Sequence, residues 1–186
     1  PTPPIVSIVI PTFRRNDGLE NAVRSILALS DSACSSSEIV IVDNSPEIGA
    51  KYTVDQLAMN ASIPIVFVSE TTPGVSNARN AGLAAANSNL IAFLDDDETA
   101  EAGWLDALLA AHEKYDAAVV FGPVRTQLPD TVAHHRNYFE GFFSREGSKE
   151  DKVIDHFFGC GNALLDLKKI RNSLPDGAPY FDALSN

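Results

Sequence analysis

Short apolar runs alternate along the first half of the chain with polar tips and with segments of helical spacing. The runs cover residues 5–10, 38–42, 63–68 and 90–94, and a helical pattern follows each of them. Continuous apolar runs of this length are typical of strands that are buried on both faces of a sheet. The pattern therefore predicts four strand–helix units in an α/β fold, with a mainly parallel sheet and helices on both faces.

The helix boundaries are predicted from capping residues and from the spacing of apolar positions. Asp17 and Glu20 have the spacing of a capping box at the first helix, and Thr99 can cap the helix that follows the fourth strand. The second helix is expected to end near Met59, and helical register in the third extends to Ala86. Each strand is thus expected to connect to the next through one helix.

The polar tips of the four strands carry the candidate chemistry. They include Thr12, Asp43, Thr72 and the acidic triplet Asp95, Asp96 and Asp97. Parallel strands bring their carboxyl ends to one edge of the sheet, where ligands of such folds bind. We therefore expect these side chains to lie around one site.

The regular pattern stops after residues 117–126. Residues 127–152 predict a long loop or short irregular helices, in which Tyr138, Phe139, Phe142 and Phe143 either pack beneath the loop or form an acceptor platform. Packing is the slightly favoured interpretation. Residues 153–170 then predict a strand-like run, a glycine pair and a helix start near Asp166.

Composition narrows the possible partners. The chain has 186 residues and a formal net charge of -11, from 25 acidic and 14 basic residues, which disfavours nucleic acid as a partner. A phosphorylated ligand would need local basic groups or a bridging metal. Two distant cysteines, Cys34 and Cys160, fit a cytoplasmic location, and no apolar run approaches the roughly 20 residues that cross a bilayer.

The acidic triplet directly follows a predicted buried strand. One of its members could cap the next helix while the others are hydrated. Three adjacent carboxylates, however, repel one another unless a cation neutralises them, and Mg²⁺ and Mn²⁺ prefer oxygen ligands. The triplet therefore favours a divalent metal site.

Four segments resemble the successive N-terminal motifs of family 2 glycosyltransferases. They are SIVIPTFRR, EIVIVDNSPE, PGVSNARNAGL and LIAFLDDDE, and FFGCGNALLD resembles a later segment on the acceptor side. The resemblance implies a GT-A fold, a nucleotide-diphosphate sugar donor, inversion, and a metal held by a D-x-D-type motif. It also implies one catalytic domain over residues 1–186, with a nucleotide-sugar-binding half in 1–126 and a partial acceptor-side segment in 127–186 that is expected to continue beyond Asn186.

The resemblance assigns roles to residues on the donor side. Pro11, Thr12 and Phe13 match the loop that borders the base, and Asp43 matches the acid that hydrogen-bonds the base, usually uracil. Arg79 matches the arginine that contacts the donor. A polar turn is the alternative for Asp43, and a surface helix position is the alternative for Arg79.

Within the triplet the resemblance makes Asp97 the principal metal ligand. Asp96 matches a ribose or metal contact, and Asp95 would bind the metal directly or through water, so the choice of two ligands among the three stays open. The chain reads Asp-Asn-Ser where family members often have Asp-Gly-Ser, which leaves the choice of base open.

The general base expected of such an enzyme has no match in this sequence. In the family it lies in a Glu-Asp motif beyond the segment that FFGCGN resembles, so we expect it past Asn186. Asp155 and Asp182 are the fallback candidates.

The leading hypothesis is a metal-dependent transfer of a sugar, from a donor that is favoured to be a uridine one, to a glycan or lipid-linked acceptor. The alternatives are a nucleotidyltransferase of related fold and a non-catalytic nucleotide-sugar-binding module. A lipid-linked acceptor would place the protein at the inner face of the cell membrane, although no basic or amphipathic segment indicates peripheral membrane association.

Overall fold

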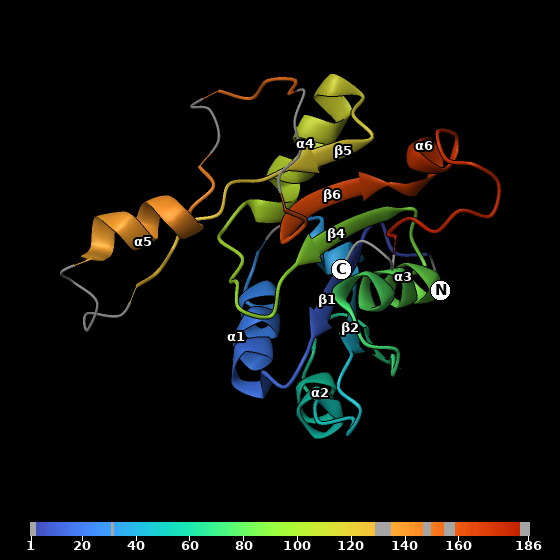
Figure 1. The fold of residues 1–186 in the computed structure, drawn as a ribbon, viewed down its shortest axis with the longest axis vertical. Coiled ribbons are helices and arrows are strands. Elements are labelled where there is room, and N and C mark those ends of the chain that lie inside the picture. Colours follow the sequence, from blue (N-terminus) through green and yellow to red (C-terminus); the bar gives the residue numbers. More distant parts are fainter. Residues whose placement is uncertain (1–2, 31, 129–134, 147–149, 155–158, 183–186) are drawn as a thin grey trace.

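The computed structural model describes residues 3–30, 32–128, 135–146, 150–154 and 159–182, which build a six-stranded sheet covered by helices (Figure 1). The strands are β1 (Ser7–Thr12), β2 (Glu38–Asp43), β3 (Ile65–Ser69), β4 (Leu90–Leu94), β5 (Val119–Phe121) and β6 (Asn162–Asp166). The helices are α1 (Asn16–Leu27), the 3-10 turn η1 (Cys34–Ser36), α2 (Lys51–Ala58), α3 (Val75–Ala85), α4 (Trp104–Tyr115), α5 (Arg136–Phe143) and α6 (Leu167–Arg171).

The sheet has the order β3-β2-β1-β4-β6-β5. β3, β2, β1 and β4 pair in parallel, whereas β6 lies antiparallel to both β4 and β5. The four predicted strand–helix units and the mainly parallel sheet are therefore confirmed.

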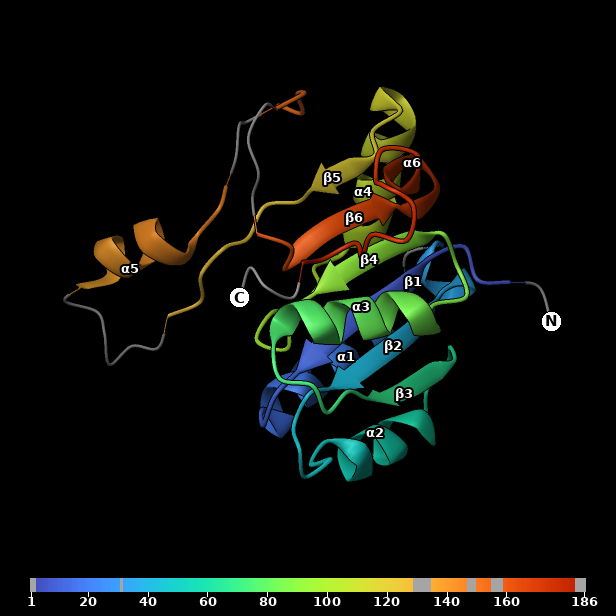
Figure 2. The same ribbon diagram turned by 45° about the vertical axis from the view of Figure 1, so that its right-hand side comes forward.

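Helices cover both faces of the sheet, as the apolar runs predicted (Figure 2). The side chains of Ile8 and Ile10 point to a core shared with α1, α2 and α4. Val9, between them in sequence, points to a second core shared with α3 and α6. Alternation along a strand that is buried on both faces explains why the runs are almost continuously apolar. The two polar residues within them, Ser7 and Glu38, are buried and joined by a hydrogen bond of 2.6 Å from Ser7 Oγ to Glu38 Oε1.

Helix α3 approaches the sheet closely at Gly82. A Cβ atom there would lie 2.5 Å from Val9 Cγ1 and 3.2 Å from Val42 Cγ2. Glycine therefore sets the short distance between α3 and the two central strands. This distance also determines how near the first turn of α3 comes to the strand ends.

The two predicted capping arrangements are wrong. Helix α1 begins at Asn16, so Asp17 lies within its first turn and Glu20 pairs instead with Arg24 at 2.7 Å. Helix α4 begins at Trp104 after Gly103, whose φ of 80° gives the left-handed conformation that ends the preceding turn.

The second half of the chain is only partly as predicted. β6 forms after the glycine pair, while residues 153–154 lie in no strand and 155–158 fall outside the described residues. Asp166 caps α6 by accepting hydrogen bonds from the backbone N–H groups of Lys168 and Lys169, which confirms the predicted helix start.

Helix α5 lies apart from the sheet in both views (Figures 1 and 2). Tyr138, Phe142 and Phe143 on this helix are 69%, 69% and 54% exposed, so the favoured interpretation, packing beneath a loop, is wrong for them. No helix within the described ranges combines the length and apolar character needed to cross a bilayer.

Candidate functional site

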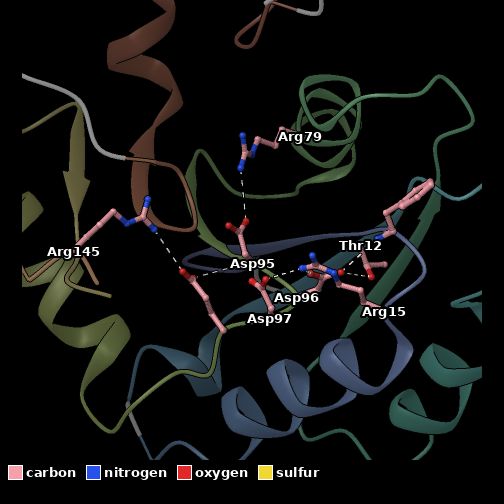
Figure 3. Close-up of polar contacts among 9 residues, drawn as sticks. Thr12, Arg15, Arg79, Asp95, Asp96, Asp97 and Arg145 are labelled. Atoms are coloured by element: carbon pink, nitrogen blue, oxygen red, sulfur yellow. Dashed lines mark hydrogen bonds and ion pairs between the residues drawn. The ribbon is translucent and has the colours of Figure 1, made fainter. Parts of the chain in front are cut away.

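A cleft of about 470 Å³ opens at the carboxyl ends of the parallel strands (Figure 3). The loop after β1, the start of α3 and the turn after β4 form its walls. The lining residues are Pro11, Thr12, Phe13, Arg15, Asn44, Pro73, Gly74, Val75, Ala78, Arg79, Asp95, Asp96 and Asp97. The predicted convergence of the strand ends is confirmed for Thr12 and the acidic triplet, whereas Asp43 and Thr72 are not among the lining residues.

Asp96 joins the turn after β4 to the loop after β1. Its side chain is buried, and Oδ2 accepts hydrogen bonds from Thr12 Oγ1 at 2.7 Å and from the Phe13 N–H at 3.4 Å. Oδ1 accepts a third from Arg15 Nη1 at 3.2 Å. With both carboxylate oxygens engaged by the protein, Asp96 holds the two loops together.

Asp97 lies at the open side of the cleft, where Oδ2 accepts a hydrogen bond from Arg15 Nη1 at 2.6 Å. The side chains of Arg15 and Asp97 are 57% and 61% exposed. The charge of Asp96, and then that of Asp97, raises the pKa of the Arg15 guanidinium. An ion pair this exposed is weak and can be exchanged for a ligand or a cation.

Asp95 turns to the opposite wall, toward Arg79 of α3 (Figure 3). Asp95 Oδ1 lies 3.7 Å from Arg79 Nη2, an ion pair without a direct hydrogen bond. Burial raises the pKa of Asp95, Arg79 offsets part of that rise, and the charges of Asp97 and Asp96 add to it. The consecutive carboxylates thus face two different arginines.

Glu98 extends the acidic group beyond the triplet. Its Oε2 accepts a hydrogen bond from the Asp95 N–H at 3.4 Å, and its Oε1 lies 3.5 Å from Arg145 Nη2. Burial, and then the charge of Asp95, raises the pKa of Glu98 to about 7. Arg145 is brought to this point by a two-stranded bridge between Val124 and Arg145, with N···O distances of 2.9 Å and 2.7 Å.

Gly161 leaves the space that these carboxylates occupy. A Cβ atom on Gly161 would lie 2.6 Å from Asp95 Oδ2 and 2.8 Å from Glu98 Oε1. Gly161 therefore belongs to the acidic side of the site, whereas Gly159, the other glycine of the pair, faces the Arg145 guanidinium.

Asp43 is fully buried and organises its own loop. Oδ1 accepts hydrogen bonds from the backbone N–H of Ser45 at 2.9 Å and from Ser45 Oγ at 2.5 Å, and Oδ2 accepts one from the Ala50 N–H at 2.8 Å. Its neighbour Asn44 lines the cleft. The polar-turn interpretation describes these contacts, and a base contact by Asp43 stays a prediction.

Asn44 ties β2 to the loop before α3. Its Nδ2 donates to the carbonyl oxygens of Glu70 and Thr72 at 2.7 Å and 2.8 Å, and its Oδ1 accepts from the Gly74 N–H at 3.1 Å. Thr72 therefore reaches the common edge through its backbone. The asparagine that departs from the family's usual glycine has a structural role here.

The end of β1 and the loop after it supply both buried and exposed groups. Pro11 and Thr12 are buried, whereas Phe13 is 51% exposed at the cleft. The Arg14 guanidinium lies 5.0 Å from the centroid of the Phe13 ring and pairs with Glu47 at 2.6 Å. This arrangement places an aromatic ring and two arginines, Arg14 and Arg15, around the first strand end.

Of the two fallback candidates for the general base, the structure describes Asp182, which does not line the cleft. Asp155 lies outside the described residues. Asp182 is exposed and directly follows Phe181, whose ring lies 5.7 Å from Arg79 Cζ. The base therefore stays unassigned, with Asp182 close in sequence to the wall that carries Arg79.

The oxygen atoms that the site offers as ligands fit a hard divalent cation. Asp95 and Asp97 present carboxylate oxygens on one turn, and their mutual repulsion would fall on binding a cation. Over the parts of the chain that the structure describes, no three His, Cys, Asp or Glu side chains are grouped to hold a metal by themselves. A cation here would need further ligands from a diphosphate or from water.

Four functional candidates escaped the sequence analysis: Arg15, Glu98, Arg145 and Gly161. Arg15 and Glu98 stand in quoted motifs, and the neighbouring positions of β1 and β4 bring the residues after these strands together. Gly161 also stands in a quoted segment, FFGCGNALLD, whereas Arg145 lies in none of the quoted segments. The predicted need for local basic groups near a phosphorylated ligand is met by Arg15 and Arg79.

Two solved glycosyltransferases of the GT-A fold share this architecture. A mannosyltransferase from Pyrobaculum calidifontis, PcManGT in complex with GDP-Man and Mn²⁺, has a TM-score of 0.58 and 21% identity over 67% of this chain and 36% of its own. Residues 1–349 of S. aureus TarS give a TM-score of 0.56 and 17% identity over 67% of this chain and 38% of theirs. The GT-A fold is thereby shown.

The sequence identifies the family. The model of Glycosyl transferase family 2 matches residues 7–174, and the chain belongs to this family. The succinoglycan biosynthesis protein ExoM of Rhizobium meliloti is 32% identical over 127 residues, which are 68% of this chain and 41% of ExoM. The GalNAc(5)-diNAcBac-PP-undecaprenol beta-1,3-glucosyltransferase of Campylobacter jejuni is 31% identical over 153 residues, 81% of this chain and 46% of that enzyme. The chain thus spans less than half the length of these two relatives.

Proposed function

We propose that this chain binds a nucleotide-diphosphate sugar and, in a metal-dependent and inverting reaction, transfers the sugar to a glycan or lipid-linked acceptor. The observation that carries the proposal is the arrangement of Asp95 and Asp97 opposite Arg79 and Arg15 in one cleft. Carboxylates suit a divalent cation and arginines suit phosphate oxygens, so one cleft offers both partners of a metal–diphosphate complex.

The comparisons support the donor class without selecting the nucleotide. One structural neighbour is described in complex with GDP-Man and Mn²⁺, and another, TarS, in complex with UDP-GlcNAc. We favour a uridine nucleotide, with Pro11, Thr12 and Phe13 bordering the base and Asp43 or its loop contacting it. Asp96 would then orient the ribose side of the cleft through the contacts that it makes to Thr12 and Phe13.

In the proposed reaction an acceptor hydroxyl attacks the anomeric carbon as the nucleoside diphosphate departs. Arg79 and Arg15 stabilise the negative charge that develops on the diphosphate. A divalent cation, Mn²⁺ or Mg²⁺, held by Asp97 and Asp95 would neutralise further leaving-group charge. The proton of the acceptor hydroxyl passes to a carboxylate, for which Asp182 and Asp155 are the candidates in this chain.

The acceptor is inferred by chemical class only. A relative from Campylobacter jejuni is named for transfer to an undecaprenol-linked glycan, and ExoM is named for succinoglycan biosynthesis. A lipid-linked acceptor would bring this chain to the inner face of the cell membrane as a peripheral protein.

Calorimetric titration with UDP, in Mn²⁺ and in EDTA, tests the proposal. Wild-type protein should bind UDP in a metal-dependent manner, and Asp97→Ala should weaken binding at least about tenfold, because a metal ligand is lost. Glu101→Ala is the matched control, since Glu101 is a 73%-exposed acid on the same connecting segment and does not line the cleft. Equal binding with and without Mn²⁺, or equal binding by wild type and Asp97→Ala, would contradict the metal-dependent mechanism.

A parallel titration with GDP and a turnover assay separate the remaining alternatives. Tighter GDP than UDP binding would replace the uridine assignment. Release of nucleoside diphosphate from a panel of nucleotide sugars supports transfer chemistry, whereas binding without release supports a binding module. Formation of a nucleotide sugar from a nucleoside triphosphate and a sugar phosphate would instead support a nucleotidyltransferase.

A further inference from the structure

Arg79 lies beside two aromatic rings that come from distant parts of the chain. Its guanidinium carbon lies 6.0 Å from the ring centroid of Phe93 on β4 and 5.7 Å from that of Phe181. The two rings meet edge to face, with centroids 5.7 Å apart and an interplanar angle of 89°. The Arg79 side chain is only 16% exposed.

Hydrogen bonds contribute little to the orientation of Arg79. The nearest carboxylate oxygen, Asp95 Oδ1, is 3.7 Å away from Nη2, and the buried Nε has no hydrogen-bond partner within the described residues. The planar guanidinium is therefore oriented mainly by ring contacts. Its N–H groups remain available to donate hydrogen bonds to a ligand that enters the cleft.

Phe181 is itself fixed to the helix that carries Arg79. Asn80 Nδ2 donates to the Phe181 carbonyl at 2.7 Å, and the Phe181 N–H donates to Asn80 Oδ1 at 3.0 Å. This reciprocal pair engages both backbone groups of Phe181 and follows Arg79 by one residue along α3. The clamp, defined as Asn80 and Phe181, thus links the segment after α6 to the donor wall of the cleft.

We infer that Asn80 and Phe181 are positioning residues that orient Arg79 for the diphosphate of the donor. The inference rests on the proposed function, in which Arg79 contacts the leaving diphosphate. With a cation on Asp95, the Arg79 N–H groups would be left for phosphate oxygens, which accept charge-assisted hydrogen bonds. The donor site is therefore completed by Phe181, which lies 101 positions after Asn80 in the sequence.

Tyr180 provides an internal comparison. It precedes Phe181 and makes the same type of contact with a different arginine: Arg171 Cζ lies 4.1 Å from the Tyr180 centroid, and Arg171 Nε donates to the Tyr180 hydroxyl at 3.2 Å. Tyr180 and Arg171 do not line the cleft. Loss of an aromatic ring at 180 therefore perturbs the same segment without removing a ring from Arg79.

The test is a calorimetric titration of UDP in Mn²⁺ with ring and clamp variants. Phe181→Leu keeps apolar volume but removes the ring, and we expect UDP binding to weaken about tenfold. Phe181→Tyr keeps the ring and should stay within about twofold of wild type, as should Tyr180→Leu. Asn80→Ala keeps the ring but frees the segment, and should weaken binding about threefold to tenfold.

A double-mutant cycle with Arg79→Ala shows whether the clamp acts through Arg79. In the Arg79→Ala background, Phe181→Leu should cause no further loss of UDP affinity, whereas independent effects would add. Thermal unfolding followed by circular dichroism accompanies every variant. If Phe181→Leu fails to fold, the same cycle is run with Asn80→Ala.

The outcomes separate this inference from the proposed function. If wild-type protein does not bind UDP or GDP with Mn²⁺, the proposed function fails, and the inference that depends on it falls too. If wild type binds but Phe181→Leu and Asn80→Ala bind equally well, the proposed function stands and the inference is overturned. Additive losses in the cycle, or equal losses in Phe181→Leu and Phe181→Tyr, overturn it as well.

Discussion

Substitution of Gly161 by alanine would place a methyl group where two carboxylates already lie. The new Cβ atom would stand 2.6 Å from Asp95 Oδ2 and 2.8 Å from Glu98 Oε1. The Asp95 oxygen has to retreat by about 0.8 Å, which is the difference between 2.6 Å and the 3.4 Å at which ordinary contact begins. The Asp95 side chain is short and only partly exposed, so a shift of its oxygen by this distance moves the carboxylate away from its position in the cleft.

The expected cost falls more on ligand binding than on folding. The crowded atoms are the ends of side chains, so we expect unfolding free energy to drop by only about 1 kcal/mol. A displacement approaching 1 Å in a reactive site can lower turnover about 100-fold. For metal-dependent UDP binding we expect about tenfold weaker affinity, equivalent to about 1.4 kcal/mol.

The assay is UDP calorimetry in Mn²⁺ and in EDTA, combined with urea unfolding of the same samples. Gly141→Ala is the control, because a Cβ atom at Gly141 meets nothing within 4 Å. Wild-type affinity in Gly161→Ala, or a loss of affinity that is the same with and without Mn²⁺, would refute the claim that Gly161 keeps room for the acidic side of the site.

Three further predictions concern the same elements. In metal-free protein the pKa of Glu98 is raised from 4.5 to about 7, so the folded state favours the protonated carboxyl and ionisation of Glu98 opposes folding. The stability that protonated Glu98 contributes is fully present below pH 4.5 and is lost as the pH rises through about 7. Urea unfolding should therefore show Glu98→Gln gaining up to about 3 kcal/mol over wild type between pH 4.5 and 8, while the exposed Glu101→Gln gains nothing. Gly82→Ala should lower unfolding free energy by about 1–3 kcal/mol, because its Cβ would meet Val9 Cγ1 at 2.5 Å; unchanged urea midpoints would contradict the close approach of α3. Asp43→Asn should cost about 2 kcal/mol in the same assay, because an amide nitrogen cannot accept from the buried Ala50 N–H; a variant that keeps its stability but loses the preference for UDP over GDP would favour the base contact instead.

The strands and the positions of their ends could be predicted from the sequence, because the apolar pattern identifies buried strands and parallel pairing brings their ends together. Apolar runs such as residues 90–94 predicted the buried strands, and β4 covers the same residues. Parallel strands bring their carboxyl ends together, so the sequence alone places Thr12 and the acidic triplet in one region. The hydrogen bond from Thr12 Oγ1 to Asp96 Oδ2 is a direct consequence of the adjacent positions of β1 and β4 in the sheet.

Other parts of the site depend on contacts that no local pattern encodes. Asp95, Asp96 and Asp97 are equivalent in composition, yet one faces Arg79, one is buried against Thr12, and one is exposed beside Arg15. These differences arise from the turn after β4 and from the arginines that meet it. Capping also failed as a guide at Asp17, since tertiary packing of α1 set the start of the helix.

The pairing of the acids with arginines affects how the cleft can bind and release ligands. Asp96, Asp97, Asp95 and Glu98 are each paired with a cationic side chain, from Arg15, Arg79 or Arg145. A cation bound together with a diphosphate would bring opposite charges to a region that is already close to electrical balance. Ligand binding would then exchange ion pairs within the protein for ion pairs between the protein and its ligands. The strongly negative chain could thus bind an anionic ligand without a large change in its overall electrostatic field.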